Sequence, residues 1–329
     1  MALTLENYTP DKENEWDEFV LHRSMNGTFL QTRKFINYHK AGKFQDCSLC
    51  VRKGNELVAV ILACELMEDG LKTFFSHKGT TYGGICLSEK IYSASEVDSL
   101  FQLLEEYWQT NGFKKIYLKM VPNIYQRSNT DLVDYYLYKS GFVNFSELNY
   151  YLPLDRYRDD IVSQFTASKR RDYRYSLRSN MQFRKLETRE EIADYYQVLL
   201  MNLEKLGVPA IHTLEDLYEL QFERFRDAIE FYGVYLDNKM IAGSMLFYFD
   251  KGIVHTQYLS SNDQYLKLFP MDFLIYNLIQ MAVDRGMSIF TFGICTENQG
   301  KYLNLGLSRF KEGFGSEFCI NHSYEKKYN

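Results

Sequence analysis

The chain has 329 residues, of which 46% are hydrophobic and 25% are charged, a composition typical of a folded protein of about two domains. Its formal net charge of −5 gives no overall basic footprint, so we expect no DNA partner. No apolar run approaches the about 20 residues that a membrane span needs. The acidic N-terminus lacks the apolar core of a secretory signal, and six scattered cysteines suit reduced thiols, so we expect a cytoplasmic protein.

The first half of the chain alternates strand-like and helix-like segments. Gly54-Asn55 lies between two apolar segments and is typical of a hairpin turn, because both residues tolerate positive φ. Residues 93–110 place apolar side chains on one face of a helix, and Gly112 ends it. The predicted strands of this half cover residues 46–54, 56–66, 71–77 and 113–120.

The second half repeats this order. A long helix is predicted over 187–207, with a Thr188 cap and Glu191 three residues later. Asp237-Asn238 forms the hairpin turn, and a further helix covers 270–285. The predicted strands of this half cover residues 228–236, 240–249, 253–260 and 287–293.

Two local matches connect the halves. Residues 54–59 resemble 237–242, and residues 111–116 resemble 285–290 in the same order. Such repetition predicts a duplicated α/β unit. We place the boundary near the charged, turn-forming stretch at 155–160, which gives domains of residues 1–157 and 158–329, the second opening with a basic helix.

The basic helix is the strongest local charge signal. Five cations and one acid lie between Lys169 and Arg178. At helical spacing Arg170, Arg174 and Arg178 fall within one arc, where guanidinium forks could bind phosphate or another polyanion. The alternative is a solvated charged face.

A glycine-rich segment, residues 77–85, follows the third predicted strand. Tyr82 and Gly83 lie in it, and glycine lets backbone N–H groups approach an oxyanion. The alternative is a plain loop between strands, and the segment is not a P-loop.

Metal chemistry is not indicated. Cys47 and Cys50 lie on a predicted strand and point to opposite faces, and the six histidines have no metal-ligand spacing. We therefore predict no metal ligands. His255 and Tyr258 share a predicted strand, but they face the same way only if a bulge lies between them.

The polar, glycine-rich stretch 292–317 follows a buried strand, and α/β folds place ligands at such ends. Lys311 lies there between Phe310 and Phe314. On the strand that we expect, Glu312 would point to the opposite face and leave the ammonium without an acid partner. Lys311 is therefore a functional candidate, and a lysine that extends to solvent is the alternative.

The order of these motifs resembles the FemAB-like branch of the GNAT acyltransferase superfamily, which includes peptidoglycan interpeptide-bridge aminoacyltransferases. The likeness covers nearly the whole chain. It rests on Asn26–Thr32, Tyr82-Gly83-Gly84, the basic helix, the hairpin 235–250, His255-x-x-Tyr258, Phe290–Gly293, Asn298–Tyr302 and Phe310-Lys311-x-x-Phe314-Gly315.

The resemblance implies two tandem GNAT-like domains, with mixed, mainly antiparallel sheets flanked by helices. It implies transfer of an aminoacyl or acyl group to an amine acceptor, such as a small molecule or a nucleotide-linked cell-wall precursor. Lys311 would stabilise the oxyanion. No cofactor would be bound permanently, and the donor would be aminoacyl-tRNA or acyl-CoA. The implied substrate-binding residues are Tyr82, Gly83, Arg170, Arg174, Arg178, His255, Tyr258 and Tyr302.

Two departures from the family pattern keep alternatives open. The chain has no long helical-hairpin insert of the kind that some tRNA-using members carry. Residues 260–274 also lack the R/Q-x-x-G-x-G/A loop that binds the pyrophosphate of acetyl-CoA. The alternatives are a CoA-dependent N-acetyltransferase and a non-catalytic ligand-binding protein on a GNAT scaffold.

Overall fold

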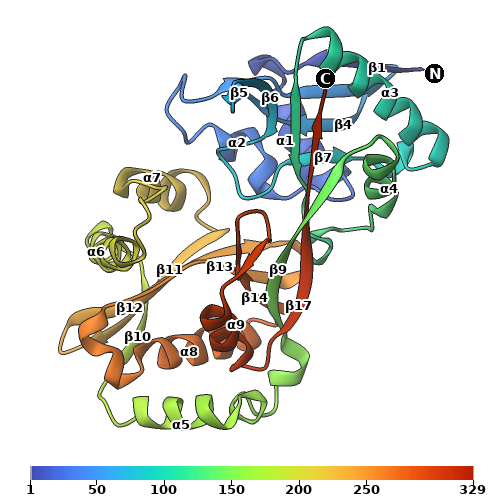
Figure 1. Cartoon of the computed structure of the whole chain (residues 1–329). Coiled ribbons are helices and arrows are strands. Elements are labelled where there is room, and N and C mark those ends of the chain that lie inside the picture. The colour runs from blue at the N-terminus through green and yellow to red at the C-terminus, as the bar shows by residue number, and fades with distance from the viewer. Residues whose placement is uncertain (1, 329) are drawn as a thin grey trace. The chain divides into compact units, whose positions relative to one another are not determined.

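The computed structural model describes residues 2–328, apart from the side chain of Leu206. It divides into two compact units (Figure 1). Unit 1 comprises Met1–Glu147, Asn298–Lys301 and Ile320–Asn329, and unit 2 comprises Leu148–Glu297 and Tyr302–Cys319. The sequence domains 1–157 and 158–329 stay a prediction. Among the described residues, no helix combines the length and the apolar character needed to cross a bilayer.

Unit 1 contains two groups of paired strands. The first is antiparallel and has the order β1 (Leu3–Asn7), β3 (Leu49–Lys53), β4 (Glu56–Leu62) and β7 (Gly84–Leu87). The second has the order β2 (Gln45–Asp46), β5 (Cys64–Glu68), β6 (Leu71–Ser76), β8 (Lys115–Lys119) and the end of β17 (Glu317–Lys327). Within it, β6 and β8 are parallel and the other neighbours are antiparallel. The helices are α1 (Glu13–Glu18), α2 (Arg33–Ile36), α3 (Ala94–Thr110) and α4 (Asp131–Lys139).

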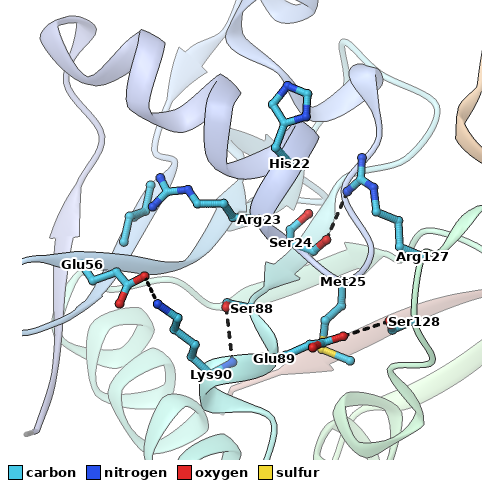
Figure 2. A pocket seen from close by; sticks show the side chains of 11 residues that line it. His22, Arg23, Ser24, Met25, Glu56, Ser88, Glu89, Lys90, Arg127 and Ser128 are labelled. Carbon is cyan, nitrogen blue, oxygen red and sulfur yellow. Dashed lines mark hydrogen bonds and ion pairs between the residues drawn. The ribbon is translucent and has the colours of Figure 1, made fainter.

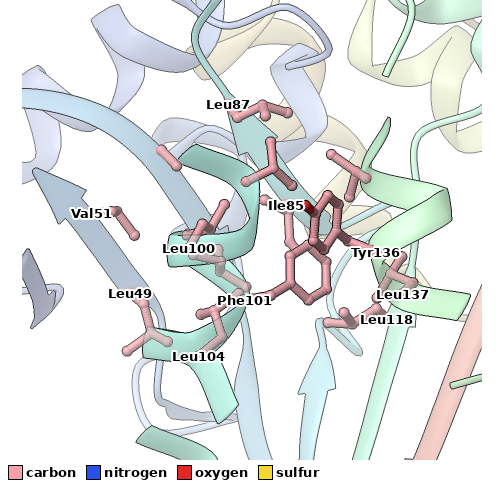
Figure 3. Packing of buried hydrophobic residues seen from close by; sticks show 14 of the residues in the cluster. Leu49, Val51, Ile85, Leu87, Leu100, Phe101, Leu104, Leu118, Tyr136 and Leu137 are labelled. Atoms are coloured by element: carbon pink, nitrogen blue, oxygen red, sulfur yellow. The ribbon is translucent and has the colours of Figure 1, made fainter. Parts of the chain in front are cut away.

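The core of unit 1 forms where α3 and α4 pack on these strands (Figure 3). The Ser93 side chain accepts a hydrogen bond from the Glu96 N–H and so caps α3. Leu100, Phe101 and Leu104 are buried at helical spacing. Phe101 stacks on Tyr136 of α4 with 5.7 Å between ring centroids. The apolar face predicted for residues 93–110 is therefore the face of α3 that is buried in the core.

Unit 2 has one group of six strands in the order β10 (Gln182–Leu186), β11 (Ile229–Leu236), β12 (Lys239–Phe249), β13 (Ile253–Ser261), β14 (Ile289–Ile294) and β9 (Val143–Pro153). Only β13 and β14 are parallel. A separate pair is formed by β15 (Thr296–Glu297) and β16 (Tyr302–Leu303). The helices are α5 (Ala167–Ser176), α6 (Arg189–Leu206), α7 (Leu214–Tyr218), α8 (Pro270–Asp284) and α9 (Leu305–Glu312).

Helices cover both faces of the strands in unit 2. Leu246 and Val254 belong to the core that includes Leu274 of α8, whereas Gly243 lies against the ring of Tyr195 of α6. Because alternate residues of a strand point to opposite faces, α8 and α6 cover opposite faces. Figure 1 shows α5 alongside α8. The α6 boundaries were correctly predicted, since a Thr188–Glu191 capping box opens it and Gly207 closes it.

Both units share one order of elements, which confirms the predicted tandem α/β fold. A hairpin, β3–β4 or β11–β12, leads to a parallel pair, β6–β8 or β13–β14, with a helix between its strands. The last strands are exchanged. The end of β9, from the first half of the chain, pairs in unit 2, and the end of β17 pairs in unit 1.

The units differ where each parallel pair ends. In unit 1, Gly83 donates its N–H to the Lys119 carbonyl at 3.0 Å and accepts from Gln31 Nε2 at 2.9 Å. The Lys119 N–H donates to Ser76 Oγ at 2.6 Å, and Tyr82 is buried beside Tyr125. The segment 77–83 therefore fills this position, and both backbone polar groups of Gly83 are used within unit 1.

Candidate active site

In unit 2 the parallel pair separates after three residues. Ile253–His255 of β13 pairs with Ile289–Thr291 of β14, and the ladder ends there. β13 continues to Ser261 along β12, while the pairing of β14 with β9 becomes irregular between Thr291 and Gly293. Ligands of α/β folds bind at the carboxyl ends of strands that separate in this way. We call this position the β13–β14 opening.

A β-bulge orients the polar side chains of β13. Met245 of β12 pairs with Tyr258, while the next residue of β12 pairs with Thr256, so Gln257 is the extra residue. His255 pairs with Phe247, two positions from Met245. Residues two positions apart on a strand share a face, so His255 and Tyr258 face the same way. The bulge that His255 and Tyr258 need in order to face the same way is therefore present.

His255 lies against Gly293 at the opening. Gly293 has φ +73, and a Cβ there would lie 3.1 Å from His255 Cε1, so this position requires glycine. The imidazole is 7% exposed. Burial, together with the nearby charge of Lys311, lowers the pKa of His255 to about 3, so the ring is neutral at physiological pH.

Lys311 lies on helix α9, and the expectation that it lies on a strand was wrong. Asn304 caps the helix by accepting from the Leu307 N–H. Gly306 and Gly313 gave the segment the composition of a loop, whereas Ser308 and Lys311 are buried at helical spacing. Only two buried residues mark the inner face of α9, which is too few for the sequence to show a helical pattern.

The Lys311 ammonium is fully hydrogen-bonded at the end of β14. Nζ donates to the carbonyl oxygens of Phe292, Gly293 and Ile294 at 2.9, 2.9 and 2.8 Å. These bonds use all three of its protons. Burial lowers the pKa of Lys311 to about 8, while the neighbouring Cys295 opposes this, so a positive charge remains at neutral pH.

A small polar network surrounds Lys311. The Glu312 carboxylate accepts from the hydroxyls of Ser308 at 2.9 Å and Tyr150 at 3.3 Å. Cys295 lies beside the ammonium, and burial raises the pKa of its thiol against the opposing effect of Lys311. The Glu312 carboxylate is therefore bound by hydroxyl groups and forms no ion pair with Lys311 within the described residues.

Tyr258 has a partner that sequence reasoning missed. Its hydroxyl lies 2.7 Å from Nδ1 of His212, which is buried in the connection between α6 and α7. Burial raises the pKa of Tyr258 well above its usual range. The two residues are far apart in the sequence and share no motif, so only the fold brings them together.

The three predicted phosphate-binding arginines lie together on α5 and the turn after it. With Ala167, Arg171 and Tyr175 they line a hollow of about 330 Å³. The Arg178 guanidinium lies over the Tyr175 ring, 4.3 Å from its centroid. Within residues 2–328, no carboxylate lies within salt-bridge distance of Arg170, Arg174 or Arg178. We call this surface the arginine hollow.

The inner face of α5 is bound to α8. Lys169 forms a 2.7 Å ion pair with Asp272 in the first turn of α8, and Tyr173 stacks on Tyr276. Burial raises the pKa of Asp272, and Lys169 opposes this. The chain's own carboxylate therefore occupies the N-terminal end of α8.

The remaining predicted residues lie elsewhere. Tyr302 is 57% exposed on β16 and pairs with Glu297. Tyr82 and Gly83 are packed within unit 1. The structure thus brings together His255 and Lys311, places Tyr258 on the same face, and gathers the arginines separately.

Unit 1 contains a hollow of about 450 Å³ (Figure 2). Its charged side chains are largely engaged within the unit. Lys90 pairs with Glu56 at 2.5 Å, and Arg127 donates to the Val20 and Ser24 carbonyls at 3.1 Å. These contacts tie the chain together, and we assign no chemistry to this hollow.

A protein-family model matches the part of the chain that contains the β13–β14 opening. Residues 165–312 match the acetyltransferase (GNAT) domain model, a range that includes His255, Gly293 and Lys311. These residues, which make up less than half of the chain, form a domain of the GNAT acyltransferase type. No curated protein sequence matches the chain significantly.

Solved structures resemble the whole chain. FemX is 14% identical, with 99% of this chain and 98% of FemX covered and a TM-score of 0.70. L-PGS from Bacillus licheniformis is 14% identical over 98% and 94%, with a TM-score of 0.60. A tandem GNAT protein from the clavulanic acid biosynthesis pathway is 8% identical over 99% and 98%, with a TM-score of 0.56. At these identities the likeness is one of fold, and it confirms the expected FemAB-like GNAT architecture.

The neutral state of His255 predicts a pH effect on stability. Between pH 6.5 and about 3 the unfolded chain binds a proton that the folded chain excludes, so the free energy of unfolding falls as pH falls through this window. His255→Gln removes this contribution. Between pH 6.5 and 4.5 the free energy of unfolding of this variant should fall by up to about 3 kcal/mol less than that of the wild type. Urea unfolding at both pH values measures this, and equal losses would contradict it.

Replacing Lys311 should destabilise the fold. Lys311→Met keeps the length of the side chain but leaves three buried carbonyls without a donor, which should lower the free energy of unfolding by about 2–4 kcal/mol. The exposed substitution Lys267→Met is the control and should change it by less than about 0.5 kcal/mol. Urea denaturation measures the free energy of unfolding of both variants. Equal values would show that Lys311 does not stabilise the end of β14.

Proposed function

We propose that the protein transfers an aminoacyl group to an amine acceptor at the β13–β14 opening of unit 2. The observation that carries this is a buried, charged Lys311 beside a neutral His255 where the parallel strands separate. In the transfer, the amine attacks the acyl carbon, a C–N bond forms, and the bond to the leaving oxygen breaks. A positive charge in a water-poor site stabilises the developing oxyanion through its field.

Two features favour an aminoacyl-tRNA donor over acyl-CoA. Residues 260–274 lack the usual pyrophosphate-binding loop, and in the same region Asp272 places a carboxylate at the N-terminal end of α8. That carboxylate, paired with Lys169, takes the position at which the helix N-terminus would otherwise attract a pyrophosphate. The arginine hollow offers phosphate-binding groups on the opposite side of α5.

The acceptor that we propose is a nucleotide-linked cell-wall precursor with a free amine. Support comes from the resemblance to FemAB-like proteins and from the shared fold with FemX. Phosphates of such an acceptor, or of the tRNA, suit the arginine hollow, because guanidinium groups bind phosphate oxygens in pairs. The second candidate is a CoA-dependent N-acetyltransferase, which the description of the matched family favours.

The donor is tested by supplying both classes. The protein is incubated with a UDP-linked peptidoglycan precursor and either tRNA charged with ¹⁴C-labelled amino acids or ¹⁴C-acetyl-CoA. We expect label in the precursor only with charged tRNA. Label from acetyl-CoA alone would establish the second candidate. Binding of either donor without transfer to the precursor would favour a non-catalytic protein.

The role of the arginine hollow is tested with Arg174→Ala. Loss of one phosphate contact should weaken tRNA binding about 5- to 100-fold and lower the slope of log Kd against log salt by about 1. Arg226→Ala is the control, because Arg226 is exposed outside the hollow. Filter binding across a salt series measures both. An unchanged slope for Arg174→Ala would show that the hollow does not contact phosphate.

A further inference from the structure

The acyl transfer proposed above requires a group that accepts a proton from the amine. Lys311 is an ammonium whose protons are all donated, so it has no acceptor. His255 is held neutral by burial and by the adjacent positive charge, which makes it a poor base. Two hydroxyls donate to Oε1 of Glu312, which is exposed on α9. Neither Lys311 nor His255, the two side chains brought together at the opening, therefore accepts this proton.

Tyr258 and His212 offer the missing acceptor on the same face of β13. Their side chains are joined by a 2.7 Å hydrogen bond between the phenol oxygen and Nδ1. Tyr258 is partly exposed, one step along this face from His255, whereas His212 is buried behind it. Tyr258 is therefore the more exposed member of the pair and the one that a substrate could contact.

The position of His212 is fixed by the start of α7. Thr213 and Asp216 form a capping box, in which each side chain accepts from the backbone N–H of the other. The Tyr196 hydroxyl of α6 donates to the His212 carbonyl at 3.1 Å. The His212 carbonyl is therefore held by α6 and the next residue by the cap of α7, as an ordered proton acceptor requires.

Two further buried hydroxyl groups, of Tyr195 and Ser260, lie on the face that carries Tyr258. Ser260 pairs with Gly243, on which the Tyr195 ring packs. The Tyr195 hydroxyl lies close to the Ser260 side chain and the Met245 backbone. The pair therefore borders other polar groups of the same face.

We propose that Tyr258 and His212 form the proton-accepting pair of the acyl transfer, an inference that rests on the proposed function. Tyr258 is the catalytic residue that touches the amine, and His212 acts through it. As the C–N bond forms, the amine proton moves to the phenol oxygen while the phenol proton moves to Nδ1. The leaving oxygen takes the electron pair of the broken bond, and the proton returns to it by the reverse path.

Other titratable groups border the pair. Tyr195 and Tyr196 lie on α6, Asp216 on α7, and His255 on β13 with Lys311 beyond it. The tyrosines stay protonated because burial raises their pKa values, and His255 stays neutral. In the proposed transfer, His212 is the group that takes up the positive charge.

His212→Asn separates proton transfer from positioning. The Asn side-chain oxygen can accept the phenol hydrogen bond as Nδ1 does, but it cannot take the proton. Transfer from ¹⁴C-aminoacyl-tRNA to the UDP-linked precursor is measured between pH 5.5 and 8.5. We expect kcat to fall about 10²- to 10⁴-fold in His212→Asn and Tyr258→Phe, with KM within about twofold and the acid limb of the kcat profile absent.

Tyr218→Phe is the matched control, because it removes a phenol of α7 whose hydroxyl donates to the Arg189 carbonyl instead. It should retain wild-type kcat, and urea unfolding checks that all variants fold. If His212→Asn keeps kcat and the acid limb, His212 only positions Tyr258 and the proposal is overturned. A wild type that is inactive with both donors would instead overturn the proposed function, and the role of the pair with it.

Discussion

Three consecutive carbonyl groups that converge on one ammonium determine the geometry of the site. In a regular strand successive carbonyls point in opposite directions, so three of them cannot reach one nitrogen atom. The end of β14 departs from a strand, with Gly293 at φ +73 and a break in the pairing with β9. Lys311 stabilises this departure by donating to residues 292–294. The opening exists because β14 is held out of the ladder that it would otherwise continue with β13.

The tandem units show two outcomes of the same topology. In unit 1 the chain inserts residues 77–83 and satisfies the end of β8 through Ser76 and Gly83. In unit 2 a single bulge residue, Gln257, stands at the corresponding place, and a lysine from α9 satisfies the backbone instead. The backbone at the end of β14 is thus satisfied by a side chain instead of by an inserted segment. The half that matches the acetyltransferase family is the half with this arrangement.

Sequence patterns predicted the regular elements because their signals are local. Turn residues gave the hairpins, and the cap at Thr188 and the stop at Gly207 gave the ends of α6. Helix α9 was missed because it is short and contains glycine. Only two of its residues are buried, so its apolar pattern is weak. The partnership of Tyr258 with His212 was missed because no spacing rule connects two residues that a sheet and a helical connection bring together. The bulge beside Tyr258 could not be predicted from the sequence, because a bulge depends on how two strands pair.

The basic helix divides its cations between two tasks. Lys169 faces α8, where its ion pair with Asp272 is supplemented by the Phe310 ring 4.3 Å from Nζ. Arg171 pairs with Asp172 at 3.1 Å, whereas Arg170, Arg174 and Arg178 line the hollow and have no acidic partner within the described residues. An anion that entered at the N-terminus of α8 would meet the Asp272 carboxylate, whereas an anion at the outer face of α5 would meet guanidinium groups. The charge distribution therefore suits an anion at the outer face of α5 better than an anion at the N-terminus of α8.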